Sequence, residues 1–238
     1  MIELTDFSKC YSNNLPAVKN VSLKCEYSKI TGLIGENGAG KTTVLRAITA
    51  RHFATQGTVT VNGINAEDFP ETVRNLTGFV QEEPRLPAEY TVAEYLSMTA
   101  RLHSVSSSRI PEDLVLSLSL ADLLPKKIGT LSKGQRERVN FSQALIYNPP
   151  VLVLDEPASG LDPAQIVNMR KFILSLKKDH TILLSTHLMQ ETEALCDYIY
   201  ILHKGTVVAH GTKETLPKEN GCSTLEETFF KLTQGEGK

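Results

Sequence analysis

The segment GENGAGKT at residues 35–42 has the residue types and the spacing of a phosphate-binding loop. Its three glycines allow the backbone N–H groups to turn inward around phosphate oxygens. Lys41 would reach the β- and γ-phosphates of a nucleotide, and the Thr42 hydroxyl would hold Mg²⁺. An ordinary glycine turn is the alternative, and the apolar strand before the loop and the helix after it disfavour that interpretation. The expected nucleotide-binding residues are Gly35, Glu36, Asn37, Gly38, Ala39, Gly40, Lys41, Thr42 and Thr43.

Two acidic residues end the apolar run VLVLDE at 151–156. Such a run is typical of a parallel strand buried on both faces, and ligands of open α/β sheets lie at the carboxyl ends of strands. Asp155 is placed to orient the Mg²⁺ shell, and Glu156 could polarise an attacking water. An acidic strand end beside a solvated loop is the alternative. Taken together with the loop at 35–42, the segment indicates a paired nucleotide site.

His187 follows the apolar segment TILLST and therefore also lies at the carboxyl end of an expected strand. It could donate a hydrogen bond to a γ-phosphate. A helix cap or a surface histidine is the alternative, so the functional interpretation depends on the other motifs.

The elements that must position these residues alternate between strand and helix, which predicts an α/β fold. Strands are expected at 30–35, 151–155 and 181–185, with a hairpin at 198–202 and 206–211, and helices at 41–52 and from 163 to about 178. The first 63 residues predict short strands at 2–9, 20–27 and 57–62, with Pro16 among the turn residues between them. The middle, about 91–147, is mainly helical. Its helix starts include Pro111, and capping boxes are expected at TVAE (91–94), SKGQ (132–135) and, later, DPAQ (162–165).

Composition limits the class of protein. The 238 residues are 41% apolar and 22% charged, which fits a globular protein with a sizeable core. The formal net charge of -2 argues against a protein that coats nucleic acid. We expect no secretory signal, since the start MIELTDFSKC has no basic or apolar region, and no membrane span of about 18 apolar residues. The four cysteines form no C-x-x-C pair and fit a reducing cytosol.

LSKGQ at 131–135 adds a second anion-binding feature. Ser132 can cap a helix whose N-terminus offers free N–H groups, and Gly134 allows close approach; a plain helix start is the alternative. With the loop at 35–42, VLVLDE, SGLD (159–162) and His187 in this order, the chain resembles the nucleotide-binding subunit of ABC transporters. The resemblance covers essentially the whole chain. It implies a P-loop NTPase that forms a single ABC ATPase domain over 1–238, with a RecA-like core, an N-terminal antiparallel β-subdomain and a helical subdomain inserted at about 83–147.

The resemblance also implies roles for individual residues. ATP would act as glue in a head-to-tail dimer, in which Ser132, Gly134 and Gln135 bind the γ-phosphate held by a second protomer. Asp162 would lie at that dimer interface. Tyr11, 30 residues before Lys41, matches the aromatic residue that stacks on adenine; a half-buried strand tyrosine is the alternative.

One segment departs from the family pattern. The family places a glutamine between the two lobes, where it senses Mg²⁺ and the attacking water. The usual register puts Glu82 at this position in GFVQEEPRLPAEYTV (78–92), and Gln81 lies one residue early. We favour Gln81, because a neutral amide avoids placing another negative charge beside the triphosphate.

The expected partners are a second ATPase protomer and a separate permease, which would dock near residues 82–100 and hold the chain on the inner face of the cell membrane. A C-terminal helix at about 224–233, capped by Ser223 with Glu226, is similar to that of exporters of drugs, antibiotics or polysaccharides. The main alternative is a soluble regulatory or mechanical ABC ATPase without a permease. A P-loop GTPase or small-molecule kinase is disfavoured, because the sequence has no N-K-x-D motif. A nucleotide-binding subunit without turnover is also disfavoured, because the chain retains Lys41, Asp155, Glu156 and His187.

Overall fold

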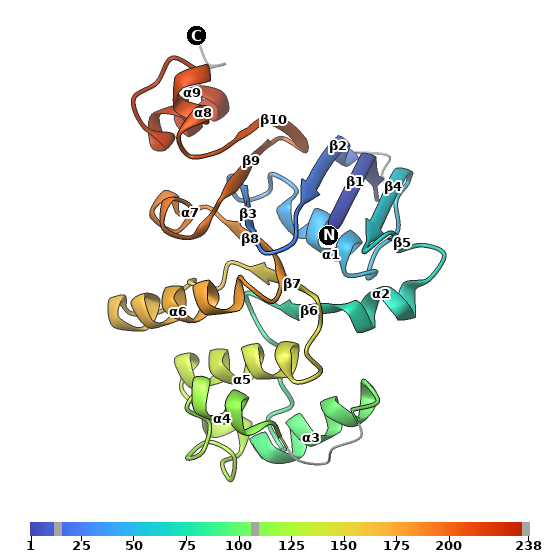
Figure 1. Cartoon of the computed structure of the whole chain (residues 1–238), viewed down its shortest axis with the longest axis vertical. Helices are drawn as coiled ribbons and strands as arrows, with labels where there is room; N and C mark the ends of the chain where they lie inside the picture. Colours follow the sequence, from blue (N-terminus) through green and yellow to red (C-terminus); the bar gives the residue numbers. More distant parts are fainter. Residues whose placement is uncertain (12–15, 106–109, 235–238) are drawn as a thin grey trace.

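The computed structural model describes residues 1–11, 16–105 and 110–234, which form two β-sheets with helices packed around them (Figure 1). In the described chain the larger sheet has the strand order β10-β9-β3-β8-β7-β6. Its strands are β3 (Ile30–Ile34), β6 (Thr77–Val80), β7 (Val151–Asp155), β8 (Thr181–Thr186), β9 (Tyr198–His203) and β10 (Thr206–Gly211). Neighbours pair in parallel, except that β10 is antiparallel to β9. This confirms the expected parallel strands and the late hairpin.

The smaller sheet is antiparallel throughout, in the order β2-β1-β4-β5. Its strands are β1 (Ile2–Cys10), β2 (Pro16–Cys25), β4 (Gln56–Val61) and β5 (Ile64–Asn65). The sheet confirms the expected N-terminal antiparallel part. Pro16, however, begins β2 instead of lying in a turn. Because β2 is an edge strand, the missing N–H of a proline can be tolerated there.

Helices cover both ends of the molecule. Figure 1 shows α3, α4 and α5 gathered beyond β6 at one end, and α8 and α9 at the opposite end. The helices are α1 (Lys41–Ile48), α2 (Pro70–Leu76), α3 (Val92–Leu102), α4 (Glu112–Ser117), α5 (Lys133–Leu145), α6 (Pro163–Leu176), α7 (Met189–Leu195), α8 (Thr215–Glu219) and α9 (Leu225–Gln234), with a 3₁₀ turn at Ile128–Thr130. Within the described ranges, none of these helices has the length and apolarity needed to cross a bilayer.

The predicted helix starts agree with the structure better than the predicted helix ends and the C-terminal cap. The three expected capping boxes form at the starts of α3, α5 and α6. The cap of α9 lies one residue later than expected, because the Glu227 N–H donates to the Thr224 hydroxyl (3.1 Å) while the Ser223 N–H donates to the Glu227 carboxylate (2.7 Å). Helix α1 ends at Ile48 instead of reaching residue 52, since Ala50 takes a left-handed φ of 50°. Helix α2 and strand β6 lie in a segment for which the sequence analysis made no assignment.

Side chains of the large sheet alternate between two apolar cores. Leu33 and Leu183 join the core that contains α1 and the four-stranded sheet. Ile34 and Leu184 join the other core, which contains residues of α3, α5, α6, α7 and α9. Because successive residues of a strand point to opposite faces, each central strand contributes to both cores. Helix α1, which begins at the phosphate loop, therefore packs between the two sheets.

The contact between Gly32 and Cys196 gives a test of this packing. A Cβ at Gly32 would lie 2.7 Å from the Cys196 Sγ, and Cys196 is buried. We expect Gly32→Ala to lower the free energy of unfolding by about 1–3 kcal/mol, as overpacked cores do. Chemical denaturation of Gly32→Ala, Cys196→Ala and the double variant measures the coupling. The double variant should regain part of the lost free energy of unfolding, because Cys196→Ala removes the clashing sulfur. Strictly additive losses would contradict the proposed clash.

Candidate active site

The register of the parallel strands brings the expected site residues to one edge of the large sheet. Ile34 of β3 pairs with Thr186 of β8, and Asp155 of β7 pairs with Ser185. The three strands therefore end at the same level. The residues that follow them directly, Gly35, Glu156 and His187, lie at this common edge, as expected for a ligand site in an open α/β sheet.

A cavity of about 250 Å³ opens at this edge, around the loop between β3 and α1. Gly38 and Gly40 have left-handed φ angles of 82° and 108°. A Cβ at Gly40 would in addition lie 2.9 Å from the Ala17 carbonyl, so this position requires glycine. The N-terminus of α1, with unpaired N–H groups typical of a first helical turn, begins at the same loop. The cavity is lined by Ala17, Glu36, Asn37, Gly38, Gly40, Lys41, Thr42, Thr43, Glu82, Asp155 and Glu156.

Lys41 is a buried cation that lines this cavity. Its side chain is 7% exposed, and Nζ donates to the Gly35 carbonyl at 2.6 Å. Nζ also lies 3.1 Å from the Glu156 Oε1, an ion pair between two buried groups. A buried ammonium is stable only with such oxygen partners. Phosphate oxygens in the cavity would offer it partners of the same kind.

Glu156 is a buried carboxylate on an unusual backbone conformation. It takes a left-handed φ of 46°, and its side chain is 6% exposed. Oε2 lies 2.9 Å from His187 Nδ1 and accepts a longer bond from the His187 N–H. Among the described residues, the Lys41 ammonium at 3.1 Å is the partner of Oε1, and no other donor meets that oxygen. If phosphate oxygens drew Lys41 away, Oε1 would need a new donor, which a water could supply.

Asp155 lies in an environment that favours a cation nearby. Ser185 Oγ donates to its Oδ1 at 2.6 Å. Burial raises the pKa of Asp155, and the negative charges of Glu156 and Glu82 raise it further against the Ser185 hydrogen bond and Lys41. Asp155 and Thr42 line the same cavity, and their carboxylate and hydroxyl oxygens are the kind of ligand that Mg²⁺ accepts. The residues fit Mg²⁺ held by one or two protein oxygens together with substrate phosphates.

The loop after β6 presents Glu82, and not the favoured Gln81, to the cavity. The Gln81 carbonyl accepts a hydrogen bond from the Asn140 side chain at 2.8 Å. The Glu82 Oε1 accepts one from Ser159 Oγ at 3.2 Å. These two contacts hold the loop with Glu82 at the cavity, which is the register that the sequence analysis disfavours. The Glu82 charge contributes to the raised pKa of Asp155 in the same cavity, where Lys41 acts in the opposite direction.

Other expected site residues lie outside this cavity. Tyr11 contacts the loop through its hydroxyl, 3.4 Å from Thr43 Oγ1, and its ring is 41% exposed. Ser132 and Gln135 cap each other at the start of α5, and Asp162 caps α6. Gly134 faces the side chain of Gln165, where a Cβ would lie 2.8 Å from Nε2. The starts of α5 and α6 are thus in contact with each other within one chain.

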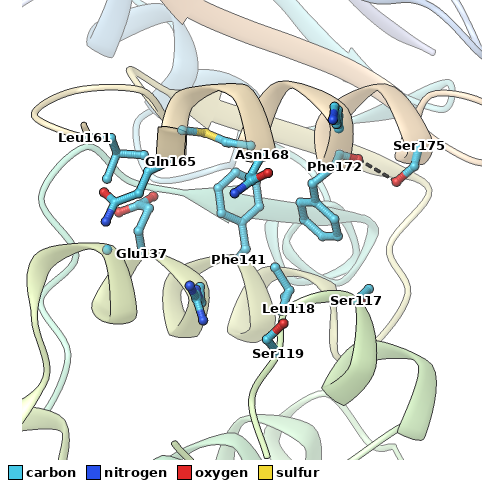
Figure 2. Close-up of a pocket in the computed structure, with 14 residues that line it drawn as sticks. Ser117, Leu118, Ser119, Glu137, Phe141, Leu161, Gln165, Asn168, Phe172 and Ser175 are labelled. Carbon is cyan, nitrogen blue, oxygen red and sulfur yellow. Dashed lines mark hydrogen bonds between the residues drawn. The ribbon is translucent and has the colours of Figure 1, made fainter. Parts of the chain in front are cut away.

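A second, larger cavity of about 570 Å³ separates α5 from α6. Figure 2 shows Glu137 at one end of this cavity, near Leu161 and Gln165, and the rings of Phe141 and Phe172 side by side between the two helices. The two aromatic rings meet edge to face with centroids 5.5 Å apart. Burial raises the pKa of Glu137 to about 7, against the opposing effects of a hydrogen bond from Asn140 and the charge of Lys133. The space between the two helices is therefore bordered by a carboxyl group that titrates near neutral pH.

Sequence reasoning missed three polar residues that support the site. Ser185 holds Asp155, Ser159 holds Glu82, and Asn140 holds the Gln81 backbone. Ser185 carried a usable signal, because a serine near the end of the apolar run TILLST has to find a polar partner. The other two carried none, since each acts on a residue 59 or more positions away.

Comparison with known proteins agrees with this geometry. The sequence matches the family described as ABC transporter over residues 18–159. It is 36% identical to the ABC transporter ATP-binding protein NatA of Bacillus subtilis (strain 168), with 99% of each chain covered. It is 34% identical to the Nod factor export ATP-binding protein I of Rhizobium meliloti, covering 94% of this chain and 68% of that one.

Solved structures show the same fold. An ATP-binding subunit of an ABC transporter, 31% identical, superposes with a TM-score of 0.90 over 98% of this chain and 99% of its own. The ATP-binding cassette MJ0796, solved as a dimer in a post-hydrolysis state with ADP and Pi, gives a TM-score of 0.80 over 89% of this chain and 98% of its own. At 23% identity, the second comparison concerns the fold alone.

The raised pKa of Glu137 predicts a pH-dependent stability. Between its ordinary value of 4.5 and about 7, the folded protein keeps a proton that the unfolded chain has lost. This contribution to stability is therefore present at low pH and declines as the pH rises through this window. Relative to wild type, Glu137→Gln should gain about 1–2 kcal/mol in the free energy of unfolding between pH 5 and pH 8.

Urea unfolding at several pH values measures this difference. Glu193→Gln is a charge-matched control, because Glu193 is exposed. A constant difference between Glu137→Gln and wild type across the pH range would contradict the buried, near-neutral carboxyl.

Proposed function

This chain is a member of the ABC transporter family of ATP-binding proteins and an ATPase, and we propose that it powers a separate membrane permease of an exporter by hydrolysing ATP in a dimer. The observation that carries the proposal is the phosphate-loop cavity, in which the Lys41 ammonium lies 3.1 Å from the Glu156 Oε1 and no other described residue pairs with that oxygen. A cation that can turn to phosphates, and a carboxylate oxygen that this movement would free, suit the hydrolysis of a nucleoside triphosphate.

In the proposed binding step, the N–H groups of 35–43 and the Lys41 ammonium hold the phosphates of ATP. The adenine ring stacks on Tyr11, whose partly exposed ring lies beside Thr43. Thr42 and Asp155 hold Mg²⁺, which neutralises charge on the phosphates. When phosphate oxygens replace the Gly35 carbonyl as partners of Lys41, the ammonium is released from the loop backbone.

In the proposed hydrolytic step, the Lys41 ammonium turns to the phosphates, and the Glu156 Oε1 that it leaves accepts a proton from the attacking water. His187 holds the other oxygen of the same carboxylate and thereby orients it. The imidazole also lies at the strand end where it can donate to the γ-phosphate. Glu82, which lines the cavity, and the neighbouring Gln81 would respond to Mg²⁺ and to the attacking water.

A second copy would complete the site. Ser132, Gly134 and Gln135 begin α5 outside the cavity of their own chain, and a helix start is a natural anion site. In a head-to-tail dimer this start faces the γ-phosphate held by the partner, with Asp162 at the interface. The cassette MJ0796, which shares this fold, was solved as a dimer.

The names of two relatives support transport out of the cell. The Rhizobium relative is named for export, and a Bacillus licheniformis relative, 31% identical over 92% of this chain, is named for bacitracin transport. The permease would dock at residues 82–100, where Tyr90 is 45% exposed. The chain would then lie at the cytoplasmic face of the membrane.

Removing the cation tests the binding step. Lys41→Ala should weaken ATP binding at least tenfold, because the buried phosphates lose their closest positive charge. Titration with fluorescent ATP measures the affinity, and Lys24→Ala, which changes an exposed lysine, is the control. Unchanged affinity in Lys41→Ala would show that 35–42 does not hold the phosphates.

Removing the base tests the hydrolytic step. Glu156→Gln keeps the shape and should retain ATP binding while the turnover number falls by at least a hundredfold. If ATP joins two protomers, this variant should elute as a dimer in size-exclusion chromatography with ATP and as a monomer without it. Adding Ser132→Arg should abolish the dimer and leave ATP binding by the monomer intact. Wild-type turnover in Glu156→Gln would remove Glu156 from the mechanism.

The loop residues are distinguished by their Mg²⁺ dependence. Since Glu82 lines the cavity, Glu82→Ala should raise the Mg²⁺ concentration needed for half-maximal ATPase activity, by about threefold or more, whereas Gln81→Ala should have a smaller effect. A larger shift in Gln81→Ala would mean that the loop changes register when ATP binds.

A further inference from the structure

Helix α5 is joined to the edge of the large sheet by side chains. Asn140 Nδ2, Gln143 Nε2 and Tyr147 Oη donate to the carbonyls of Gln81, Phe79 and Thr77, at 2.8, 2.9 and 2.7 Å. We call these three hydrogen bonds the α5–β6 seam. Asn140 and Gln143 lie three residues apart on one face of α5, and Tyr147 lies in the turn that follows the helix. Thr77 and Phe79 lie two residues apart in β6, where their carbonyls point to the same side, and Gln81 directly follows the strand.

The seam occupies a position that another strand would otherwise fill. In the described chain β6 is the outermost strand, with β7 as its inner neighbour. A Cβ at Gly78 would lie 2.3 Å from the Ala144 carbonyl, so the helix approaches the strand as closely as backbones allow. The seam and this close approach therefore hold α5 against β6 in one register.

The first of the three bonds lies where β6 passes into the nucleotide loop. Asn140 is fully buried, and its Nδ2 also lies 3.2 Å from the Glu137 Oε1. Its Oδ1 is 3.5 Å from Gln143 Nε2, which fixes the amide orientation. The bond to the Gln81 carbonyl thus holds the residue directly before Glu82, which lines the ATP cavity.

We propose that Asn140 is a positioning residue for ATP hydrolysis: it holds the Gln81 carbonyl and thereby sets the position of Glu82 in the nucleotide cavity. The proposal rests on the proposed function of that cavity. Glu82 itself accepts a hydrogen bond from Ser159, so its side chain and the backbone before it have separate anchors. The same helix begins at Ser132, and a shift of α5 is therefore transmitted to the loop through one buried amide.

The test compares two variants that each remove one bond of the seam. Asn140→Leu removes the donor beside the nucleotide loop, and Tyr147→Phe removes the donor to Thr77 at the far end of β6. Both should lower the melting temperature, by about 2–4 °C for each lost hydrogen bond. Asn140→Leu alone should lower the turnover number by roughly tenfold to a hundredfold and shift the Mg²⁺ dependence, because a misplaced loop affects catalysis. The affinity for ATP should stay within about threefold of wild type, since Lys41 is untouched.

Asn140→Asp keeps the shape in case Asn140→Leu fails to fold. Its carboxylate cannot donate to the Gln81 carbonyl, whereas its protonated form can. Its activity relative to wild type should therefore recover as the pH is lowered from about 8 to about 6, as protonation beside Glu137 is favoured by burial.

Equal losses of turnover in Tyr147→Phe and Asn140→Leu would overturn the proposal, and so would folded Asn140 variants with wild-type turnover and Mg²⁺ dependence. Failure of the proposed function has a different signature, because the wild-type protein itself would then neither bind nor hydrolyse ATP.

Discussion

The buried ion pair between Lys41 and Glu156 is the constraint on which the arrangement of the site depends. Neither charge could be buried alone without a large loss of stability, so each requires the other at a short distance. The two residues follow strands that are separated by β8, and only the matched ends of β3, β7 and β8 bring them to 3.1 Å. The apolar alternation that buries each central strand on both faces thus also determines the electrostatics of the cavity.

Features carried by a few contiguous residues could be predicted from the sequence. The phosphate loop, the acidic end of VLVLDE and the capping boxes at 91–94, 132–135 and 162–165 each depend on neighbours within eight residues. Their local chemistry leaves few alternatives. The α/β class followed from the same segments, because continuous apolar runs between helical patterns require a parallel sheet covered on both faces.

Features that depend on distant residues could not be predicted. Glu82 lines the cavity in place of Gln81, and the loop is held in this position by Asn140 of α5 and by Ser159 of the segment after β7. Strand β6 is short and contains Gly78, a poor strand former, whose presence is explained only by the close crossing of α5. The cap of α9 was missed by one residue because Ser223 and Thr224 are chemically equivalent, and tertiary packing chooses between them.

The α5–β6 seam has a consequence for solubility. An unpaired strand edge is a template for β-pairing with another chain, and proteins commonly protect such edges with charges, prolines or covering elements. Here the covering element is a helix that supplies side-chain donors in place of a strand's backbone donors. If α5 and the turn after it separate from the sheet, the Thr77 and Phe79 carbonyls of β6 and the Gln81 carbonyl just beyond it become free to pair with a foreign strand. A movement of α5 that broke the three hydrogen bonds of the seam would therefore expose a strand edge that can start aggregation.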